Sequence, residues 1–178
     1  MATPTEGRRS AAGRPRPSGV PKLRAAAFED FDDLVEIFRG LDRYHAELWP
    51  DFFLERSRTI AYFHGLMIDD DARLVVVEEG GELLGAAIGR VYDAPEDPII
   101  APLRRVHVAA LVVRPDHRRR GLGRALMDAI ATWGAEQGAE QLVLTVWAGN
   151  EGAQALYDAL DYHEVNRVLV KDLPRGGL

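Results

Sequence analysis

One stretch of thirteen residues, RPDHRRRGLGRAL from Arg114 to Leu126, constrains the fold more than any other part of the chain. It follows RRVHVAALVV (104–113), a mostly apolar run typical of a central strand. Its last residues begin a segment in which apolar residues recur at helical spacing, and Gly138 can end that helix. The sequence therefore predicts a buried strand, a turn rich in arginine and glycine, and a helix beginning near Gly121. The apolar face of that helix comprises Leu122, Ala125, Leu126, Ala129, Ile130 and Trp133.

The turn has the composition of a phosphate-binding site. The first amides of a helix have no partner inside it, and the positive end of the helix dipole lies there. Glycines at 121 and 123 allow a ligand close to the backbone, and the arginines add positive charge. A solvated helix N-terminus has the same composition, so the stretch by itself leaves both interpretations open. It is neither a Walker loop nor the dinucleotide fingerprint GxGxxG, because position 126 is a leucine.

Composition excludes several classes of protein. The 178 residues carry a formal net charge of −6, which argues against a general nucleic-acid-binding protein. There is no cysteine, so a disulfide framework, a thiolate nucleophile and a zinc-thiolate site are all impossible, and no metal site is expected. No run approaches the roughly 18 apolar residues of a membrane span, and no apolar leader follows the first residues. We therefore expect a cytoplasmic protein that does not bind membranes.

The hydrophobic pattern divides the chain into a tail and one domain. Residues 1–20 are basic and rich in proline, serine and glycine, and we expect them to be disordered, either as a solvated leader or as a weak interaction arm. Residues 21–178 have the material for a single domain. Besides the strand at 104–113 and the helix after Gly121, strands are expected at 22–27, 72–79, 82–92, 141–147 and 164–173, and helices at 28–41, 54–68 and 150–160.

Two motifs in this order resemble the signatures of the GCN5-related N-acetyltransferases (GNAT). The coenzyme A signature, R/Q-x-x-G-x-G/A, is matched by Arg118, Gly121 and Gly123. The second signature, N-x-x-A-x-x-L-Y-x-x-L-G-F, is matched from Asn150 through Tyr157 and ends in Asp-Tyr instead of Gly-Phe. The resemblance covers about residues 22–173.

The resemblance implies an α/β (α+β) fold, with a mixed, mostly antiparallel twisted sheet of six to seven strands flanked by about four helices. The fourth and fifth strands would splay apart to admit acetyl-coenzyme A. Backbone groups of Leu111, Val112 and Val113 would pair with the pantetheine arm, as a strand pairs with a sheet edge. The pyrophosphate would lie on the backbone amides of residues 119–124. The predicted cofactor-binding residues, in addition to those three, are Arg118, Arg119, Arg120, Gly121, Leu122, Gly123, Arg124 and Asn150.

The resemblance also assigns catalytic roles. Tyr157 matches the family's usual acid, which protonates the departing thiolate; a buried amphipathic tyrosine is the alternative. Many members carry a glutamate base on the fourth strand, but Ala109 and Ala110 stand there in this chain. His107 is the nearest titratable residue upstream and is the candidate base, although a structural histidine is equally plausible. The resemblance implies that Asn150 contacts the cofactor arm or a bound water; a cap on the following helix is the alternative, and one residue can do both.

The sequence predicts an acetyltransferase but does not identify its acceptor. In this family the acceptor site is built by the first two helices and the loop before the fourth strand, and aromatic and acidic side chains there suit a cationic amine. The acceptor would be a small cationic metabolite or a protein amino group, and a non-catalytic coenzyme A sensor of the same fold is the alternative. A homodimer is possible, since dimers are the commonest assembly. The candidate acceptor residues are Tyr44, His45, Glu47, Trp49, Asp51, Phe52, Phe53, Glu96 and Asp97.

Overall fold

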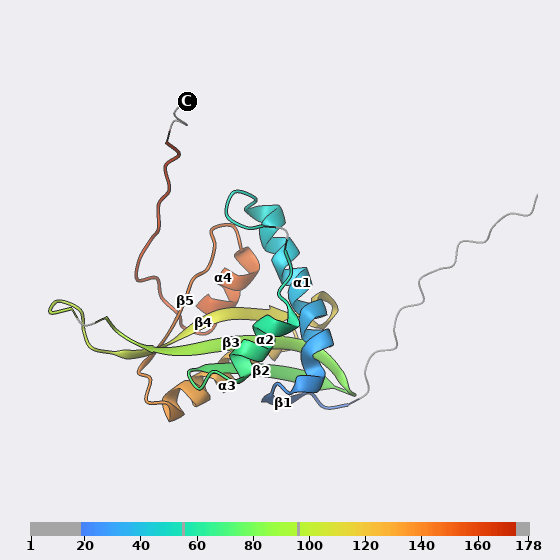
Figure 1. The fold of residues 1–178 in the computed structure, drawn as a ribbon. Coiled ribbons are helices and arrows are strands. Elements are labelled where there is room, and N and C mark those ends of the chain that lie inside the picture. The colour runs from blue at the N-terminus through green and yellow to red at the C-terminus, as the bar shows by residue number, and fades with distance from the viewer. Residues whose placement is uncertain (1–18, 55, 96, 174–178) are drawn as a thin grey trace, which may run out of the picture.

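Five strands pair in chain order to form one mixed sheet, with antiparallel pairing everywhere except between the last two strands (Figure 1). The computed structural model describes residues 19–54, 56–95 and 97–173. Its elements are β1 (Lys22–Ala25), η1 (Phe28–Asp30), α1 (Phe31–Leu48), α2 (Ile60–Met67), β2 (Ala72–Glu79), β3 (Glu82–Asp93), β4 (Arg104–Val113), η2 (Pro115–His117), α3 (Leu122–Glu136), β5 (Gln141–Leu144) and α4 (Glu151–Asp158).

The predicted fold class is confirmed, but the predicted number of strands is wrong. Within the described residues the sheet has five strands instead of six to seven, and four α-helices flank it. Residues 164–173 have the composition of a strand but pair with nothing in the described chain, and a strand exists only where a neighbour satisfies its backbone groups. The strand predicted at 141–147 ends at Leu144. The predicted tail, residues 1–20, lies outside the described residues except for positions 19 and 20.

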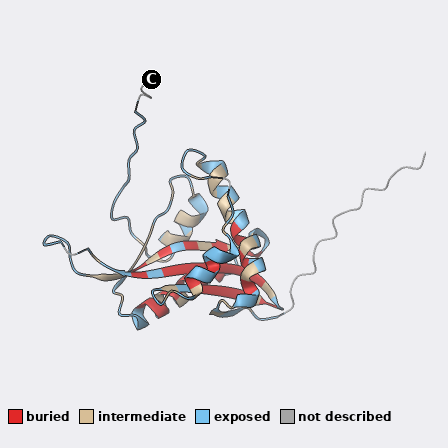
Figure 2. Cartoon of the chain, viewed as in Figure 1, coloured by how far each residue is buried: buried red, intermediate tan, exposed pale blue. Residues whose placement is uncertain are grey.

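Helices cover both faces of the sheet and create two apolar clusters. On one face α1 and α2 pack against β2 to β4, and on the other face α3 packs against β1 to β4. Figure 2 shows the buried residues concentrated in the central strands, between these two helical layers. The α1/α2 face is centred on Leu34, Phe38 and Phe63, and the α3 face on Leu126, Ile130 and Trp133.

Helix α1 continues for seven residues beyond the predicted end, through Leu48. Aspartates in its first turn favour its start, and Leu34, Ile37 and Phe38 form its buried face. The aromatic residues beyond position 41 interrupt the apolar periodicity, but the backbone stays helical there. The periodicity therefore placed the end of the helix too early. The helix ends where Pro50 disfavours helical geometry at the preceding residue.

A β-bulge in β4 reverses which face its side chains occupy. Ala110 pairs with Ile88 and Val108 pairs with Gly89, so Ala109 is an extra residue without a partner across the ladder. Val106 and Val108 consequently belong to the α3 cluster, whereas Ala110 and Val112 belong to the α1/α2 cluster. Val108 and Ala110 are two positions apart, yet they lie on opposite faces of the sheet, which the alternation of a regular strand cannot predict.

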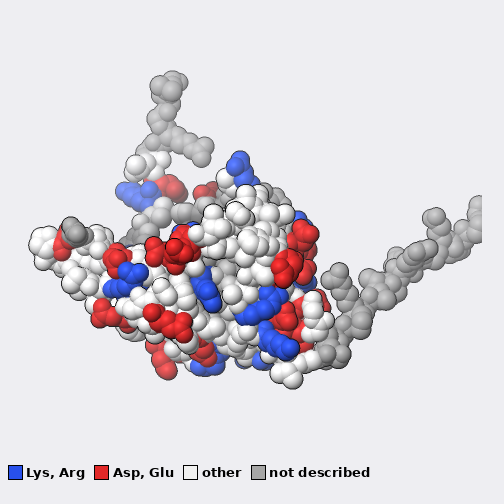
Figure 3. Space-filling model, turned by 60° about the horizontal axis from the view of Figure 1, so that its bottom comes forward, with Lys and Arg blue, Asp and Glu red and all other residues white. Residues whose placement is uncertain are grey.

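Several charged side chains on the surface form ion pairs with one another. Figure 3 shows a face on which acidic and basic side chains are interspersed. Arg24 of β1 binds the buried carboxylate of Asp30 at 2.6 Å and that of Glu78 at 2.7 Å, which joins β1 to η1 and β2. No helix in the described residues is long and apolar enough to cross a membrane. The same residues contain no cluster of three or more histidine, aspartate or glutamate side chains that could hold a metal ion.

Candidate active site

The sheet opens between β4 and β5. These strands pair in parallel over only four residues, from Arg105 opposite Gln141 to Val108 opposite Leu144. Beyond that point β4 continues to Val113 while β5 has ended, so within the described chain residues 109–113 have no strand on this side. The predicted splay is therefore present, and the residues predicted to pair with pantetheine, 111–113, lie along the unpaired edge.

The turn after β4 presents a row of unpaired amides. None of the backbone amides of residues 119–124 donates a hydrogen bond to another described residue. The first amide of α3 that does so is that of Ala125, which donates to the carbonyl of Gly121 at 3.0 Å. Gly121 caps α3 with a φ of 79°, a left-handed conformation that favours glycine. Arg119 also has a positive φ, of 62°. The turn thus has the open, donor-rich geometry that a diphosphate requires.

The arginine side chains of the turn are mostly bound within the protein. Arg118 donates to the carbonyl of Val113 at 3.3 Å, and Arg124 donates to the carbonyl of Ala159 at 2.6 Å. Arg114 donates to the carbonyl of Leu83 at 2.7 Å. Arg119 is exposed and has no partner among the described residues. The backbone, more than these side chains, is therefore arranged to receive an anion.

Arg120 is bound on two sides, by residues that the sequence did not single out. Its guanidinium binds the carboxylate of Glu79, at the end of β2, at 2.9 Å, and lies 2.8 Å from Nδ1 of His117. Glu79 and His117 are both buried, with exposed fractions of 5% and 6%. The only feature of the sequence that marks Glu79 is its position as a charged residue at the end of an apolar strand, and such residues are too common to indicate a functional site.

The second signature packs directly against the first. A Cβ atom on Gly123 would lie 3.1 Å from a methyl group of Leu156 in α4, so this glycine admits α4, in addition to any ligand. The bond from Arg124 to Ala159 joins the same two helices. The two motifs therefore form one structural unit at the open edge of the sheet.

Tyr157 lies in α4 and packs on the α3 side of the sheet. Burial, together with the neighbouring Tyr162, raises the pKa of Tyr157 to about 12, so its hydroxyl keeps its proton through the neutral range. The hydroxyl makes no hydrogen bond to another described residue. Asn150 caps α4: its side-chain oxygen accepts a bond from the amide of Ala153 at 3.2 Å. The capping role considered for Asn150 is thus present in the structure.

His107 lies on the opposite face of the sheet from Tyr157. It stands between Val106 and Val108, both of which point toward α3, so its side chain is on the α1/α2 face. It pairs with Val143 at the last stretch where β4 and β5 remain together, and it is half-buried. The two candidate catalytic groups therefore lie on opposite faces of the sheet.

Most of the candidate acceptor residues gather at the end of α1. We define the aromatic cluster as His45, Trp49, Phe52, Phe53 and Trp147. Trp147, which follows β5, was not predicted; its ring lies 4.8 Å from that of Phe53 and 5.5 Å from that of Trp49. Glu47 and Asp51 are exposed beside it in sequence. Asp97 lies in the loop that projects from β3 and β4 at the left of Figure 1, and Glu96 lies outside the described residues.

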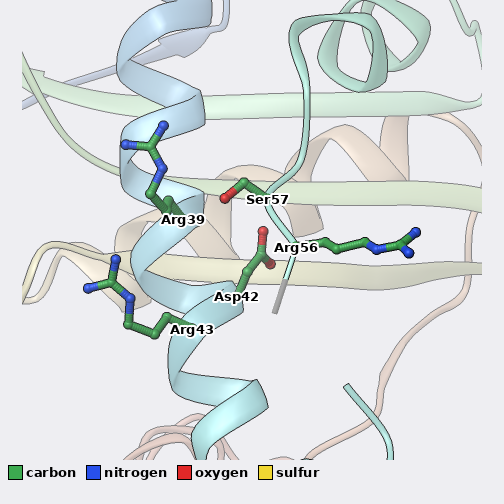
Figure 4. Close-up of a pocket in the computed structure, with 5 residues that line it drawn as sticks. All are labelled: Arg39, Asp42, Arg43, Arg56 and Ser57. Carbon is green, nitrogen blue, oxygen red and sulfur yellow. The ribbon is translucent and has the colours of Figure 1, made fainter. Parts of the chain in front are cut away.

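A hollow of about 250 Å³ lies beside α1 and is lined by Arg39, Asp42, Arg43, Arg56 and Ser57 (Figure 4). Asp42 already forms an ion pair with Arg58, and Figure 4 shows Arg56 pointing away from α1. None of the predicted site residues lines this hollow. It is therefore not part of the candidate active site.

Comparison with known proteins decides the family. The model of the Acetyltransferase (GNAT) family matches residues 34–162. The chain belongs to this family. That match includes both signature motifs, and the N-acetyltransferase resemblance inferred from them is confirmed.

Individual relatives of this GNAT protein are distant. An uncharacterized N-acetyltransferase of Methanocaldococcus jannaschii, MJ1207, is 27% identical over 149 residues, which cover 80% of this chain and 60% of the relative. The L-amino acid N-acyltransferase MnaT of Escherichia coli is 25% identical over 158 residues, 87% of this chain and 84% of the relative. The BH1408 protein of Bacillus halodurans shares the fold, with a TM-score of 0.81 at 20% identity, covering 85% of this chain and 99% of that one.

Proposed function

We propose that this GNAT protein is an N-acetyltransferase that transfers the acetyl group of acetyl-coenzyme A directly to a primary amine. The observation that carries the proposal is the row of unpaired amides at 119–124, at the end of a strand whose edge is open over residues 109–113. Membership of the family and relatives named as acetyltransferases support the same activity. A solved neighbour with a TM-score of 0.62 at 21% identity, covering 88% of this chain and 99% of its own, is AAC(6')-Iy in complex with the bisubstrate analog CoA-S-monomethyl-acetylneamine.

Acetyl-coenzyme A would bind through its pantetheine amides, which resemble a peptide backbone, and through its anionic pyrophosphate. The unpaired edge of β4 at 111–113 offers amides and carbonyls to the pantetheine amides, in the manner of an added strand. The amides of residues 119–124, at the positive end of α3, would hold the pyrophosphate. In this arrangement Arg120 positions the turn through Glu79, and the exposed Arg119 is the side chain free to meet a phosphate.

The chemistry needs three groups, and the opening between β4 and β5 supplies candidates for each. Acetyl-coenzyme A supplies an activated acetyl group as a thioester. His107, directly or through water, would accept the proton of the amine as its nitrogen bonds to the acetyl carbon. A backbone amide near Val112 or Val113 would stabilise the charge on the thioester oxygen. As the carbon–sulfur bond breaks, Tyr157, protonated because of its pKa of about 12, would give its proton to the sulfur.

The aromatic cluster suits a cationic or aromatic amine. Phe52 is 53% exposed and Trp49, Phe53 and Trp147 are half-buried, so ring faces remain available next to the exposed carboxylates of Glu47 and Asp51. The aromatic cluster and these carboxylates together favour ammonium groups, by cation–π attraction and by ion pairing. A small cationic metabolite and a protein amino group both fit this chemistry; a relative 41% identical over 54 residues, 30% of this chain and 36% of its own, is the bS18-alanine N-acetyltransferase of Escherichia coli.

A coenzyme A sensor without activity is the second candidate, favoured by the alanines at 109 and 110 where many members carry a glutamate. Thiol release from acetyl-coenzyme A, measured against amino acids, polyamines, aminoglycosides and peptides with free amines, separates the two. The chain has no cysteine, so the protein adds no thiol background. Release that depends on one class of acceptor supports the enzyme. Tight binding of acetyl-coenzyme A by calorimetry with no release from any acceptor supports the sensor, and absence of binding refutes both.

A further inference from the structure

The loop between α1 and α2, residues 49–59, carries three of the five rings of the aromatic cluster: Trp49, Phe52 and Phe53. In its described part the loop forms neither helix nor strand. Its internal backbone bonds, which begin at the amides of Phe52, Phe53 and Arg56, reach only a few positions back along the chain. Such bonds do not fix the loop relative to the rest of the domain, so other contacts must do so.

Arg58, near the end of this loop, attaches it to α1 and α2. Its guanidinium forms an ion pair with Asp42 of α1, and its backbone amide donates to the same carboxylate at 3.2 Å. The guanidinium carbon also lies over the rings of Phe38 in α1 and Tyr62 in α2, 4.9 and 5.7 Å from their centroids. Figure 4 shows Asp42 directed from α1 toward this loop. The two paired side chains are only 24% and 13% exposed, so water screens their attraction less than that of a pair on the open surface.

Trp147, on the other side of the aromatic cluster, is attached to α4. Its carbonyl accepts a hydrogen bond from the amide of Asn150 at 3.1 Å and one from the side chain of Gln154 at 3.4 Å. Its ring lies 4.8 Å from that of Phe53. Tyr157, the candidate acid, belongs to the same helix. The aromatic cluster therefore joins a loop that is held on α1 to the helix that carries the candidate acid.

We infer that Asp42 and Arg58 are positioning residues, which hold the rings of the loop against Trp147 and thereby determine which amines the enzyme accepts. The inference rests on the proposed function, because it concerns the acceptor of that reaction. Neither side chain belongs to the aromatic cluster or to the opening between β4 and β5, so both act through the loop. Preorganised rings bind a ligand more tightly than rings that must first be ordered.

The pair formed by Asp42 and Arg58 also suits a cationic acceptor. Burial and, to a smaller extent, the charge of Arg58 lower the pKa of His45, so this member of the aromatic cluster is uncharged at neutral pH. The carboxylate of Asp42 balances the guanidinium, so the pair adds no net charge beside the rings. Without a positive charge of its own, the cluster leaves its ring faces open to cation–π contact with an ammonium group.

The first test compares the two substrates of the reaction in Arg58→Met, which keeps an unbranched side chain on Phe38 and removes the charge. We expect the KM of the amine to rise by about tenfold, while the Kd of acetyl-coenzyme A stays within about twofold of the wild-type value, because the turn at 119–124 is not altered. Asp42→Asn should have the same effects. The double variant should lose no more than the more impaired single variant, since both changes break one pair.

The matched control is Arg43→Met. Arg43 follows Asp42 directly, lines the same hollow and forms no ion pair in the described chain, so its replacement removes a positive charge but no attachment. It should leave the KM of the amine and the Kd of acetyl-coenzyme A unaltered. If the wild type transfers acetyl groups and Arg58→Met has the same KM for the amine, the inference is overturned and the proposed function stands. An equal rise of this KM in Arg43→Met overturns it too, because the charge of the hollow would then be the cause.

The second test observes the rings without any reaction. The indoles of Trp49 and Trp147 lie 5.5 Å apart, close enough for their transitions to couple, and the coupled circular dichroism signal is the part that Trp147→Phe removes. Arg58→Met should weaken this signal while it still binds acetyl-coenzyme A, which shows that the domain is folded. If the wild type acetylates no amine, the proposed function fails and this signal decides the inference. A loss in Arg58→Met then supports the positioning of the rings, and an unaltered signal overturns it.

Discussion

The guanidinium of Arg120 binds the buried carboxylate of Glu79, with 2.9 Å between Nη2 and Oε2. This bond connects the turn that carries the free amides to the end of β2, a strand 41 positions earlier in the sequence. Arg120 also contacts His117 of η2, within the same turn. Arg120 thus fixes the position of the backbone that we propose binds the cofactor, although it belongs to a motif in which every arginine is a candidate phosphate ligand.

Removing the carboxylate of Glu79 should loosen the turn. We expect Glu79→Gln to weaken acetyl-coenzyme A binding by about tenfold, while kcat at saturating donor changes little, because the turn is mispositioned but the reacting groups are intact. Calorimetric titration and the split between KM and kcat measure this. The control is Glu140→Gln, at an exposed position before β5. Equal binding by Glu79→Gln and the wild type would show that the ion pair does not position the amides.

Gly121 should be intolerant of side chains for a conformational reason. No atom lies within 4 Å of a Cβ built there, so the cost of Gly121→Ala arises from its φ of 79°. We expect a loss of about 1 kcal/mol in the free energy of unfolding and weaker binding of acetyl-coenzyme A, measured by urea denaturation and calorimetry. Gly121→Asp, which adds a negative charge to the anion site, should abolish detectable binding. Unchanged affinity in Gly121→Asp would refute the location of the pyrophosphate.

Tyr157→Phe should lower kcat by about 100-fold with little change in the affinity for acetyl-coenzyme A, because the variant keeps the ring and loses only the proton donor. Since the pKa of Tyr157 is raised to about 12, deprotonation of this residue should cause no fall in the wild-type rate between pH 8 and 10. Tyr162→Phe is the matched control, since the two rings lie 5.6 Å apart. Full turnover in Tyr157→Phe would remove Tyr157 from the mechanism.

The role of His107 can be read from the pH dependence of kcat/KM. If His107 accepts the proton of the amine, His107→Ala should lower kcat/KM and change its dependence on pH. His64→Ala, in α2 against Phe28, is the control. An identical pH profile in the alanine variant would assign the proton to water or to another group.

Asp30 should make stability dependent on pH. Hydrogen bonds from Arg24 lower the pKa of this buried carboxyl, so in the folded protein it stays ionised to lower pH than in the unfolded chain. Its stabilisation is therefore complete above the ordinary carboxyl pKa and is lost as the pH falls through the lowered one. Asp30→Asn should cost about 2–3 kcal/mol at neutral pH and less in acid, measured by urea denaturation, whereas the exposed Asp70→Asn should cost little at either. A cost that is the same at both pH values would contradict this origin.

Local signals in the sequence determined the order of elements and the chemistry at the turn. An apolar run, a glycine that needs a positive φ and an amphipathic helix act over a few residues, so β4, Gly121 and α3 were predictable. The four helices were predictable in number and order, although α2 begins at Ile60, six residues after its predicted start. The second motif was equally local, and its match to α4 with Asn150 at the cap followed from the residue types alone.

Only the tertiary structure decided what depends on pairing and distance. The bulge at Ala109 exchanges the faces of β4, and it does so because β3 sets the register. Glu79 and Trp147 reach the site from segments far apart in the chain, and no local pattern marks them. Leu156 belongs to the second motif, but its contact with Gly123 depends on how α3 and α4 pack. Residues 164–173 have the composition of a strand, but a strand also needs a partner, and the described chain does not supply one.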